Sequence, residues 1–191
     1  MSSAATQPST RDQILDAAEN LFATQGYAAT TIKQVAEQVG IQGPAIYKHF
    51  DNKRALFEEV LERLFSPFTA MLTQRDLVDD QAGIVRQHLQ NLNASRIVQL
   101  ATLSGGEDLA LLVERWYRPF FRQTRELLDS GQPGLSPVTV MAFHSMLLGY
   151  LTLAPLHRAI FDTDPLGDSA MQELLALEGG LAKLLASLSP A

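Results

Sequence analysis

Three side chains suited to contacting a nucleic acid lie side by side in the stretch GIQGPAIYKHF, residues 40–50. Tyr47, Lys48 and His49 bring a phenol, an ammonium and an imidazole, and each can donate a hydrogen bond to a phosphate oxygen or a base edge. Two glycines and a proline interrupt the chain just before them. The chemistry that this cluster predicts is binding, and the neighbouring helices must position it.

The residues around the cluster predict two short helices joined by a tight turn. The stretch TIKQVAEQV begins with a capping-box pair, Thr31 and Gln34, and ends at Gly40, which suits the left-handed position after a helix. Pro44 fits the first position of a second helix, which ends near residues 49–50. This is the layout of a helix-turn-helix, whose second helix enters the DNA major groove. The apolar residues expected to lock the two helices together are Val35, Val39, Ile41 and Ile46.

A further helix is expected before this unit. Thr10 and Gln13 stand in capping-box relation, so the first helix should begin near Arg11, and Gly26 should stop it.

A long helix is expected after the unit, from Lys53 towards Gln74. Asp51 or Asn52 can cap its start, and Pro67 should bend it.

The net charge of −6 argues on its face against a polyanionic partner. Within residues 1–60, five basic residues stand against seven acidic ones. However, backbone N–H groups at helix starts bind phosphate without a basic side chain. The five basic residues are Arg11, Lys33, Lys48, Lys53 and Arg54.

The remainder of the chain shows helical periodicity and no convincing strand pattern, which predicts an all-α protein. Helices are expected at residues 79–93, 94–103, 107–131, 136–161 and 168–188. The third of these contains Pro119, which should kink it, and the fourth, with Ser136 as its cap, is apolar on nearly every face. Burial of that helix on two sides, by its own domain and by a second subunit, would explain its composition.

Aromatic residues near the expected kink are candidates for lining an effector pocket, because a kink opens the packing locally. Phe, Met and Leu side chains there favour an apolar or aromatic ligand. An ordinary aromatic core is the alternative for each residue. The candidates are His88, Trp116, Tyr117, Phe120, Phe121, Met146 and Tyr150, with Arg122 and His157 as further contributors.

Catalytic and metal sites find no support in the sequence. The chain has no cysteine, and its four histidines are scattered without a metal-ligand spacing. Neither a Gly-x-Ser-x-Gly motif nor a phosphate-binding loop is present. We therefore expect no cofactor, no metal and no enzymatic activity.

The run GYAATTIKQVAEQVGIQGPAIYKHFDNKRALFEEVL, residues 26–61, closely resembles the amino-terminal domain of TetR-family transcriptional regulators. An aromatic residue ends the first helix, and the later motifs follow at the family's spacing. These motifs are Gly26-Tyr27, Thr30-Thr31, Val35-Ala36, Gly40-Ile41, Tyr47 to Phe50, and Lys53 to Leu56.

The resemblance implies roles for individual residues. Thr31 resembles the hydroxyl that meets a phosphate, Tyr47 and His49 the phosphate-contacting pair, and Lys53 the lysine that reaches the DNA backbone. Ala45 and Lys48 stand where base-facing side chains usually lie. The full predicted DNA-binding set is Thr31, Lys33, Gln42, Gly43, Pro44, Ala45, Tyr47, Lys48, His49 and Lys53.

Three positions depart from the family pattern. Gln42 stands where Ser or Thr, better helix caps, are usual, and Gly43 lacks a side chain that often contacts a base. Lys48 replaces a common aromatic residue. Few direct base contacts remain, so recognition should depend on phosphate contacts and DNA shape.

Taken together, the sequence predicts a flexible tail (residues 1–8), a three-helix DNA-binding domain (9–52), a connecting helix (53–74) and a helical effector-binding and dimerisation domain (75–191). The expected function is that of a cytoplasmic, homodimeric repressor that leaves a pseudo-palindromic operator on binding a small ligand. Two alternatives remain at this point: a small helical carrier or enzyme that uses the carboxy-terminal cavity, and a regulator triggered by a partner protein. No membrane partner is expected, because the longest apolar stretch is too short to span a bilayer.

Overall fold

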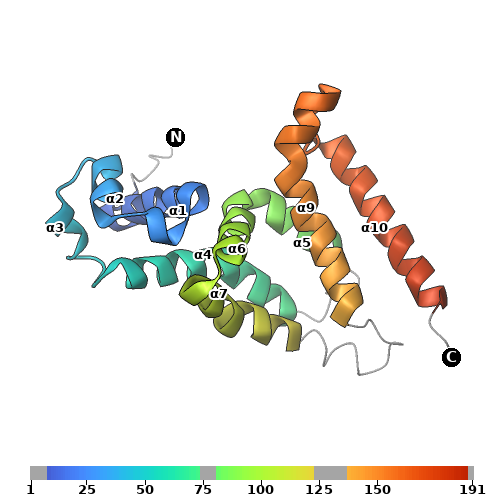
Figure 1. The fold of residues 1–191 in the computed structure, drawn as a ribbon, viewed down its shortest axis with the longest axis horizontal. Coiled ribbons are helices and arrows are strands. Elements are labelled where there is room, and N and C mark those ends of the chain that lie inside the picture. The colour runs from blue at the N-terminus through green and yellow to red at the C-terminus, as the bar shows by residue number, and fades with distance from the viewer. Residues whose placement is uncertain (1–7, 74–80, 123–136, 189–191) are drawn as a thin grey trace, which may run out of the picture.

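The computed structural model describes residues 8–73, 81–122 and 137–188, and no β-strand occurs among them. Helices α1 (Thr10–Ala29), α2 (Ile32–Val39), α3 (Gly43–Ile46) and the start of α4 (Lys53–Thr73) form a compact unit at one end, here called the head. Figure 1 shows α4 leaving the head and running into the second unit, here called the body. The all-α prediction is confirmed.

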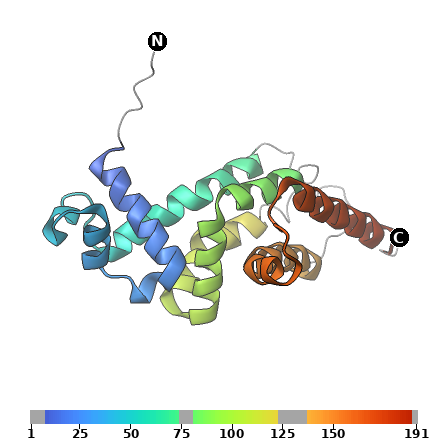
Figure 2. The same ribbon diagram turned by 90° about the horizontal axis from the view of Figure 1, so that it is seen from above.

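The body begins with α5 (Gln81–Gln90) and α6 (Leu92–Ser104). It continues through α7 (Gly106–Leu112) and a π-helical turn, η1 (Val113–Tyr117), and the helix extends from there to residue 122. The two long helices α9 (Pro137–Phe161) and α10 (Asp168–Leu188) close the described chain. They diverge from the loop that joins them and stand away from the head in both views (Figures 1 and 2).

Local signals explain most helix boundaries in the head. The capping box of Thr31 and Gln34 is confirmed, with both reciprocal hydrogen bonds formed, and Gly40 has the expected left-handed conformation (φ 77°, ψ 29°). Asn52 caps α4 by accepting a hydrogen bond from the Ala55 N–H at 2.9 Å.

Two boundary predictions were wrong. The capping box of α1 pairs Ser9 with Asp12, one residue earlier than the predicted pair Thr10 and Gln13. The carboxylate of Asp12 also accepts from the Ser9 hydroxyl, which lowers the pKa of Asp12 and makes this the stronger box. The helical part of α3 is only four residues long, and Pro44 occupies its second position, because the helix begins at Gly43 and ends at Ile46.

A single hydrophobic core runs from the head into the body, because α6 packs along α1 as Figure 2 shows. Ile14, Phe22 and Phe57 are buried in the head, and the same cluster continues to Ile97 and Trp116 in the body. A smaller cluster joins α5, α9 and α10 through Val85, Leu147, Leu151, Met171 and Leu174. None of the described helices is both long and apolar enough to cross a membrane.

Candidate nucleic-acid interface and effector region

The polar cluster of the turn lies on the outer surface of the head. Tyr47 is 54% exposed, and Lys48 and His49 are also exposed, whereas Ile46 and Phe50 on either side are buried. Because the apolar residues anchor the segment from below, the polar ones project from its outer face. The predicted lock is present: Ile46 is buried beside Val35, and Val39 and Ile41 pack against the same core.

Residues 47–49 form a turn in place of a continued α-helix. The N–H groups of His49 and Phe50 both donate to the Ile46 carbonyl, at 2.9 and 3.0 Å. Gln42 precedes α3 without a side-chain cap, so only its carbonyl holds the turn, through the Ala45 N–H at 2.8 Å. The departure noted at Gln42 therefore corresponds to the missing side-chain cap at the start of α3.

The start of α2 provides a further exposed polar position. The Thr31 hydroxyl accepts from the Gln34 N–H at 3.2 Å and donates to Gln34 Oε1 at 3.0 Å. Lys33, one residue into α2, has a side chain that is 84% exposed and pairs with Glu37 at 3.7 Å. Thr31 and Lys33 thus stand at the exposed amino-terminal end of an eight-residue helix, where N–H groups favour anions.

Most other basic residues of the head are held by acidic ones on the side where α1 meets α4. Arg11 pairs with Glu59 and also lies over the Phe50 ring, 4.9 Å from its centroid. Arg54 pairs with Glu58 at 3.0 Å. These two pairs engage Glu58 and Glu59, two of the seven acidic residues in residues 1–60.

Lys53 lies at the inner corner of the head. Its ammonium donates to the carbonyls of Tyr27 and Thr30, both at 2.8 Å, and the Tyr27 ring centroid is 4.2 Å away. The side chain is half-buried. The lysine expected to reach the DNA backbone is therefore engaged with protein carbonyls.

In the body, the predicted aromatic residues divide into separate environments. Trp116 is buried in the main core and packs on Phe65, with ring centroids 5.8 Å apart. Phe120 is partly buried and packs against the same core. The π-helical turn ends two residues before Pro119, where the Arg118 N–H bonds to the Val113 carbonyl. Just before the expected kink, the structure therefore has a widened helical turn.

Tyr117, His88 and Phe121 surround a residue that the sequence reasoning missed, His144 of α9. The Tyr117 hydroxyl lies 3.3 Å from His144 Nε2, and the His144 ring centroid lies 6.2 Å from that of His88 and 6.0 Å from that of Phe121. Phe68 of α4 packs on His88 at 4.6 Å. We call these five residues the imidazole cluster. No local sequence signal marks His144, since its neighbours come from three other segments.

Burial changes the acid–base behaviour of this cluster. It lowers the pKa of His144 to about 4, with a smaller contribution from His88, and it raises the pKa of Tyr117. His144 is therefore neutral near pH 7, and one of its ring nitrogens can accept a hydrogen bond.

Met146 and Tyr150 lie apart from the imidazole cluster. Met146 is two residues from His144 and so points to nearly the opposite side of α9. The Tyr150 hydroxyl donates to the Pro165 carbonyl at 2.8 Å, and its ring packs on the smaller hydrophobic cluster.

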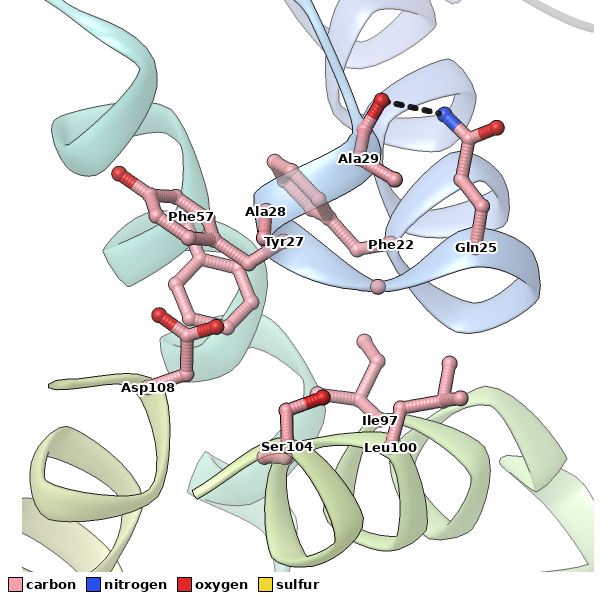
Figure 3. Close-up of a pocket in the computed structure, with 12 residues that line it drawn as sticks. Phe22, Gln25, Tyr27, Ala28, Ala29, Phe57, Ile97, Leu100, Ser104 and Asp108 are labelled. Atoms are coloured by element: carbon pink, nitrogen blue, oxygen red, sulfur yellow. Dashed lines mark hydrogen bonds between the residues drawn. The ribbon is translucent and has the colours of Figure 1, made fainter. Parts of the chain in front are cut away.

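A cavity of about 90 Å³ lies between the head and the body (Figure 3). Residues 26–29 and Phe57 of the head form one side, and Ile97, Ser104 and Asp108 form part of the other. Burial raises the pKa of Asp108. In the part of the chain that the structure describes, no group of three histidine, aspartate or glutamate side chains is placed to hold a metal ion.

Comparisons with known proteins agree with the geometry of the head. Residues 14–60 match the family described as "Bacterial regulatory proteins, tetR family". The chain is 46% identical over 82 residues to the HTH-type transcriptional regulator TtgR of Pseudomonas putida, covering 42% of this chain and 39% of that protein. It is 41% identical over 51 residues to the HTH-type transcriptional repressor KstR2 of Rhodococcus jostii, covering 27% and 25%. These matches span well under half the length of each relative.

The fold of the whole chain is also known from solved structures. A transcriptional regulator from Aquifex aeolicus, described as a member of the "TerR/AcrR family", superposes with a TM-score of 0.62 at 19% identity, over 92% of this chain and 99% of that one. At this identity the likeness shows the fold alone.

Proposed function

We propose that this chain, whose helix-turn-helix domain belongs to the TetR family of bacterial regulatory proteins, is a DNA-binding transcriptional repressor. The observation that carries the proposal is the outer face of the head. There Tyr47, Lys48 and His49 are exposed on a turn whose apolar neighbours, Ile46 and Phe50, are buried. A surface of hydrogen-bond donors on a small rigid domain suits a DNA groove.

The proposed contacts fall into two groups. Thr31, Lys33, Tyr47 and His49 bind phosphates, since they combine exposed donors with the N–H groups of α2. Lys48 and Ala45 face base edges, where an ammonium can donate to guanine and a methyl group can pack on thymine. Gly43 and Pro44, which lack a long side chain, would let the backbone approach the DNA closely, and the exposed Gln42 amide beside them can hydrogen-bond to it.

We further propose that the protein is a homodimer joined through α9 and α10. Both helices carry large apolar side chains that are exposed in the single chain. A second copy is the occupant that a regulator of this kind requires, because a pseudo-palindromic operator needs two heads about 34–36 Å apart. The exposed residues are Leu153, Leu156, Ile160 and Phe161 on α9 and Leu177, Leu181 and Leu184 on α10.

The ligand in this proposal is a small apolar or aromatic molecule bound in the body beside the imidazole cluster. Tyr117 and His144 offer one polar contact within aromatic surroundings. The ligand would favour a conformation in which α4 sets the two heads at the wrong spacing, so ligand and DNA would each weaken the binding of the other.

Equilibrium binding to the DNA upstream of the protein's own gene tests the function. Repression requires tighter binding to this duplex than to a shuffled duplex of equal composition, with an affinity that falls as salt rises. Equal, weak binding to both duplexes at low salt would refute the proposal.

A further inference from the structure

We propose that the imidazole cluster binds a neutral aromatic molecule that carries a hydroxyl group, a phenol, and that His144 and Tyr117 recognise this hydroxyl. The inference rests on the proposed function, because it names the chemical class of the ligand in the body. The cluster joins side chains from four parts of the chain: Phe68 of α4, His88 of α5, Tyr117 and Phe121 of η1 and the helix that continues it, and His144 of α9.

The polar groups of the cluster are enclosed by protein and still accessible. Tyr117, Phe121 and His144 each remain partly exposed, whereas Phe68 and His88 are buried. Burial nevertheless lowers the pKa of His144 and raises that of Tyr117, so protein atoms surround both polar groups. Side chains with both properties can be reached by a small molecule that is itself largely surrounded by protein, which is the usual setting of a ligand site.

The rings of the cluster favour an aromatic ligand. His144 lies edge to face with His88 and Phe121, at interplanar angles of 68° and 85°. Tyr117 meets the same imidazole at 72°, with ring centroids 5.5 Å apart. Aromatic pairs prefer this edge-to-face arrangement. A bound aromatic ring can therefore join the cluster through further pairs of the same kind.

The polar contact inside the cluster is long enough to admit a second partner. The Tyr117 hydroxyl lies 3.3 Å from His144 Nε2, beyond the usual range for a hydrogen bond of a hydroxyl. A tyrosine hydroxyl has one donor and two acceptor sites, and a neutral imidazole has one of each. Whichever ring nitrogen of His144 carries the proton, a ligand hydroxyl finds one group to donate to and one to accept from. An ether oxygen can only accept, and a methyl group can do neither.

A charged ligand fits these surroundings less well. None of the five side chains is an aspartate, glutamate, lysine or arginine. Burial keeps His144 neutral near pH 7, and the same surroundings penalise any other charge placed beside it. A neutral phenol brings a donor and an acceptor without that penalty.

Binding of 4-fluorophenol and 4-fluorotoluene, which differ only in a hydroxyl and a methyl group, tests the class of ligand without DNA. Titrations followed by fluorine NMR give the dissociation constant of each probe. The ratio of the toluene constant to the phenol constant should fall about tenfold in His144→Phe, because the ligand hydroxyl loses its imidazole partner. Tyr117→Phe, which keeps the ring, should lower the same ratio and serves if His144→Phe does not fold.

Tyr150→Phe is the matched control. It removes a hydroxyl from the body that bonds to the Pro165 carbonyl outside the cluster, so the ratio should stay within about twofold of the wild-type value. The charged probe 4-fluorobenzoate should bind the wild type at least about tenfold more weakly than 4-fluorophenol.

Three results would overturn the proposal: no saturable binding of 4-fluorophenol, an equal ratio in the wild type and the cluster variants, or tighter binding of 4-fluorobenzoate. Failure of the proposed function is a separate result, seen in the upstream-duplex measurement. If the ratios change as predicted and the protein does not prefer that duplex, the phenol site stands and the repressor function fails. If the protein prefers the duplex and the ratios are equal, the repressor function stands and the phenol site fails.

Discussion

Three helices of the head start with a side-chain cap, whereas α6 and α7 of the body start without one and the long helices α9 and α10 expose large apolar side chains. In the head, helix starts are capped by Ser9, Thr31 and Asn52, and the inner corner is held by Lys53. In the body, leucines on α9 and α10 are exposed, and His144 is half-buried among aromatic rings. Burial also raises the pKa of Glu178 in α10.

This contrast indicates which partner each unit is expected to bind: DNA for the head, and a second copy and a ligand for the body. Because three helices of the head are capped and packed on one another, we expect the head to present the same surface to DNA with and without a ligand in the body. For the body, with its exposed apolar side chains on α9 and α10 and its half-buried imidazole, we propose that a second copy and a ligand add stability. Surface substitutions in one unit should therefore leave the folding of the other largely intact.

The largest expected effect comes from placing charge on the exposed face of the body. Leu156→Glu combined with Ile160→Glu, at positions 56% and 62% exposed, should raise the dimer dissociation constant at least about 1,000-fold, because two carboxylates would be buried on association. Sedimentation equilibrium measures the constant. Leu103→Glu, at an 84% exposed position on α6, is the matched control and should leave the dimer intact. Equal dissociation in both variants would place the interface elsewhere.

The next effect concerns the pH dependence of stability. Burial lowers the pKa of His144 to about 4, so between about pH 6.5 and pH 4 the unfolded chain binds a proton that the folded chain does not. The free energy of unfolding should therefore fall by roughly 3 kcal/mol as the pH falls through this window. Urea unfolding at several pH values measures it.

Two variants isolate this contribution. His144→Phe should remove the part of the pH dependence that comes from the lowered pKa of His144, while His88 remains at the site. His49→Gln, which removes a histidine from the exposed face of the head, is the matched control. A wild-type profile in the His144→Phe protein would show that another group is responsible.

A smaller effect is expected in base discrimination by the head. Lys48→Ala should reduce the preference for the correct base at one position in each half-site, by about 1–3 kcal/mol, because one side chain contacts one base pair. Competition binding with duplexes changed at single positions measures the loss. A uniform loss at all positions would instead identify Lys48 as a phosphate contact.

The smallest effect tests the uncapped start of α3. Gln42→Ser should raise the free energy of unfolding by about 0.5–1 kcal/mol, since a serine hydroxyl can accept from an N–H group that Gln42 leaves uncapped. Gln38→Ser, an exposed change within α2, should instead lower it by a few tenths of a kcal/mol. A decrease in the free energy of unfolding for Gln42→Ser would mean that a side-chain cap does not fit this turn.

Local rules predicted much of the head because its boundaries depend on residues three or four apart. Thr31 with Gln34, Gly40 and Asn52 all act as expected. The start of α1 was misplaced because two overlapping pairs fit the same rule, and only the extra hydroxyl–carboxylate bond of Ser9 and Asp12 separates them.

The candidate sites were harder to predict because they depend on distant contacts. Lys53 meets carbonyls 23 and 26 positions away, and His144 meets Tyr117 across 27 positions. Contacts between residues so far apart in the sequence cannot be recognised from the spacing of neighbouring residues. Trp116 illustrates the same limit. It is a buried core residue, and the residue types around it in the sequence could not distinguish that role from lining a pocket.

Footprinting of the wild-type protein on its upstream DNA tests most directly whether two complete heads are joined by one body interface. The predicted result is two protected segments on one face of the duplex, with centres about one helical turn, roughly 34–36 Å, apart. In the Leu156→Glu and Ile160→Glu double variant, both segments should lose protection at the same protein concentration. A single protected segment in the wild type, or no difference between the two proteins, would contradict the account.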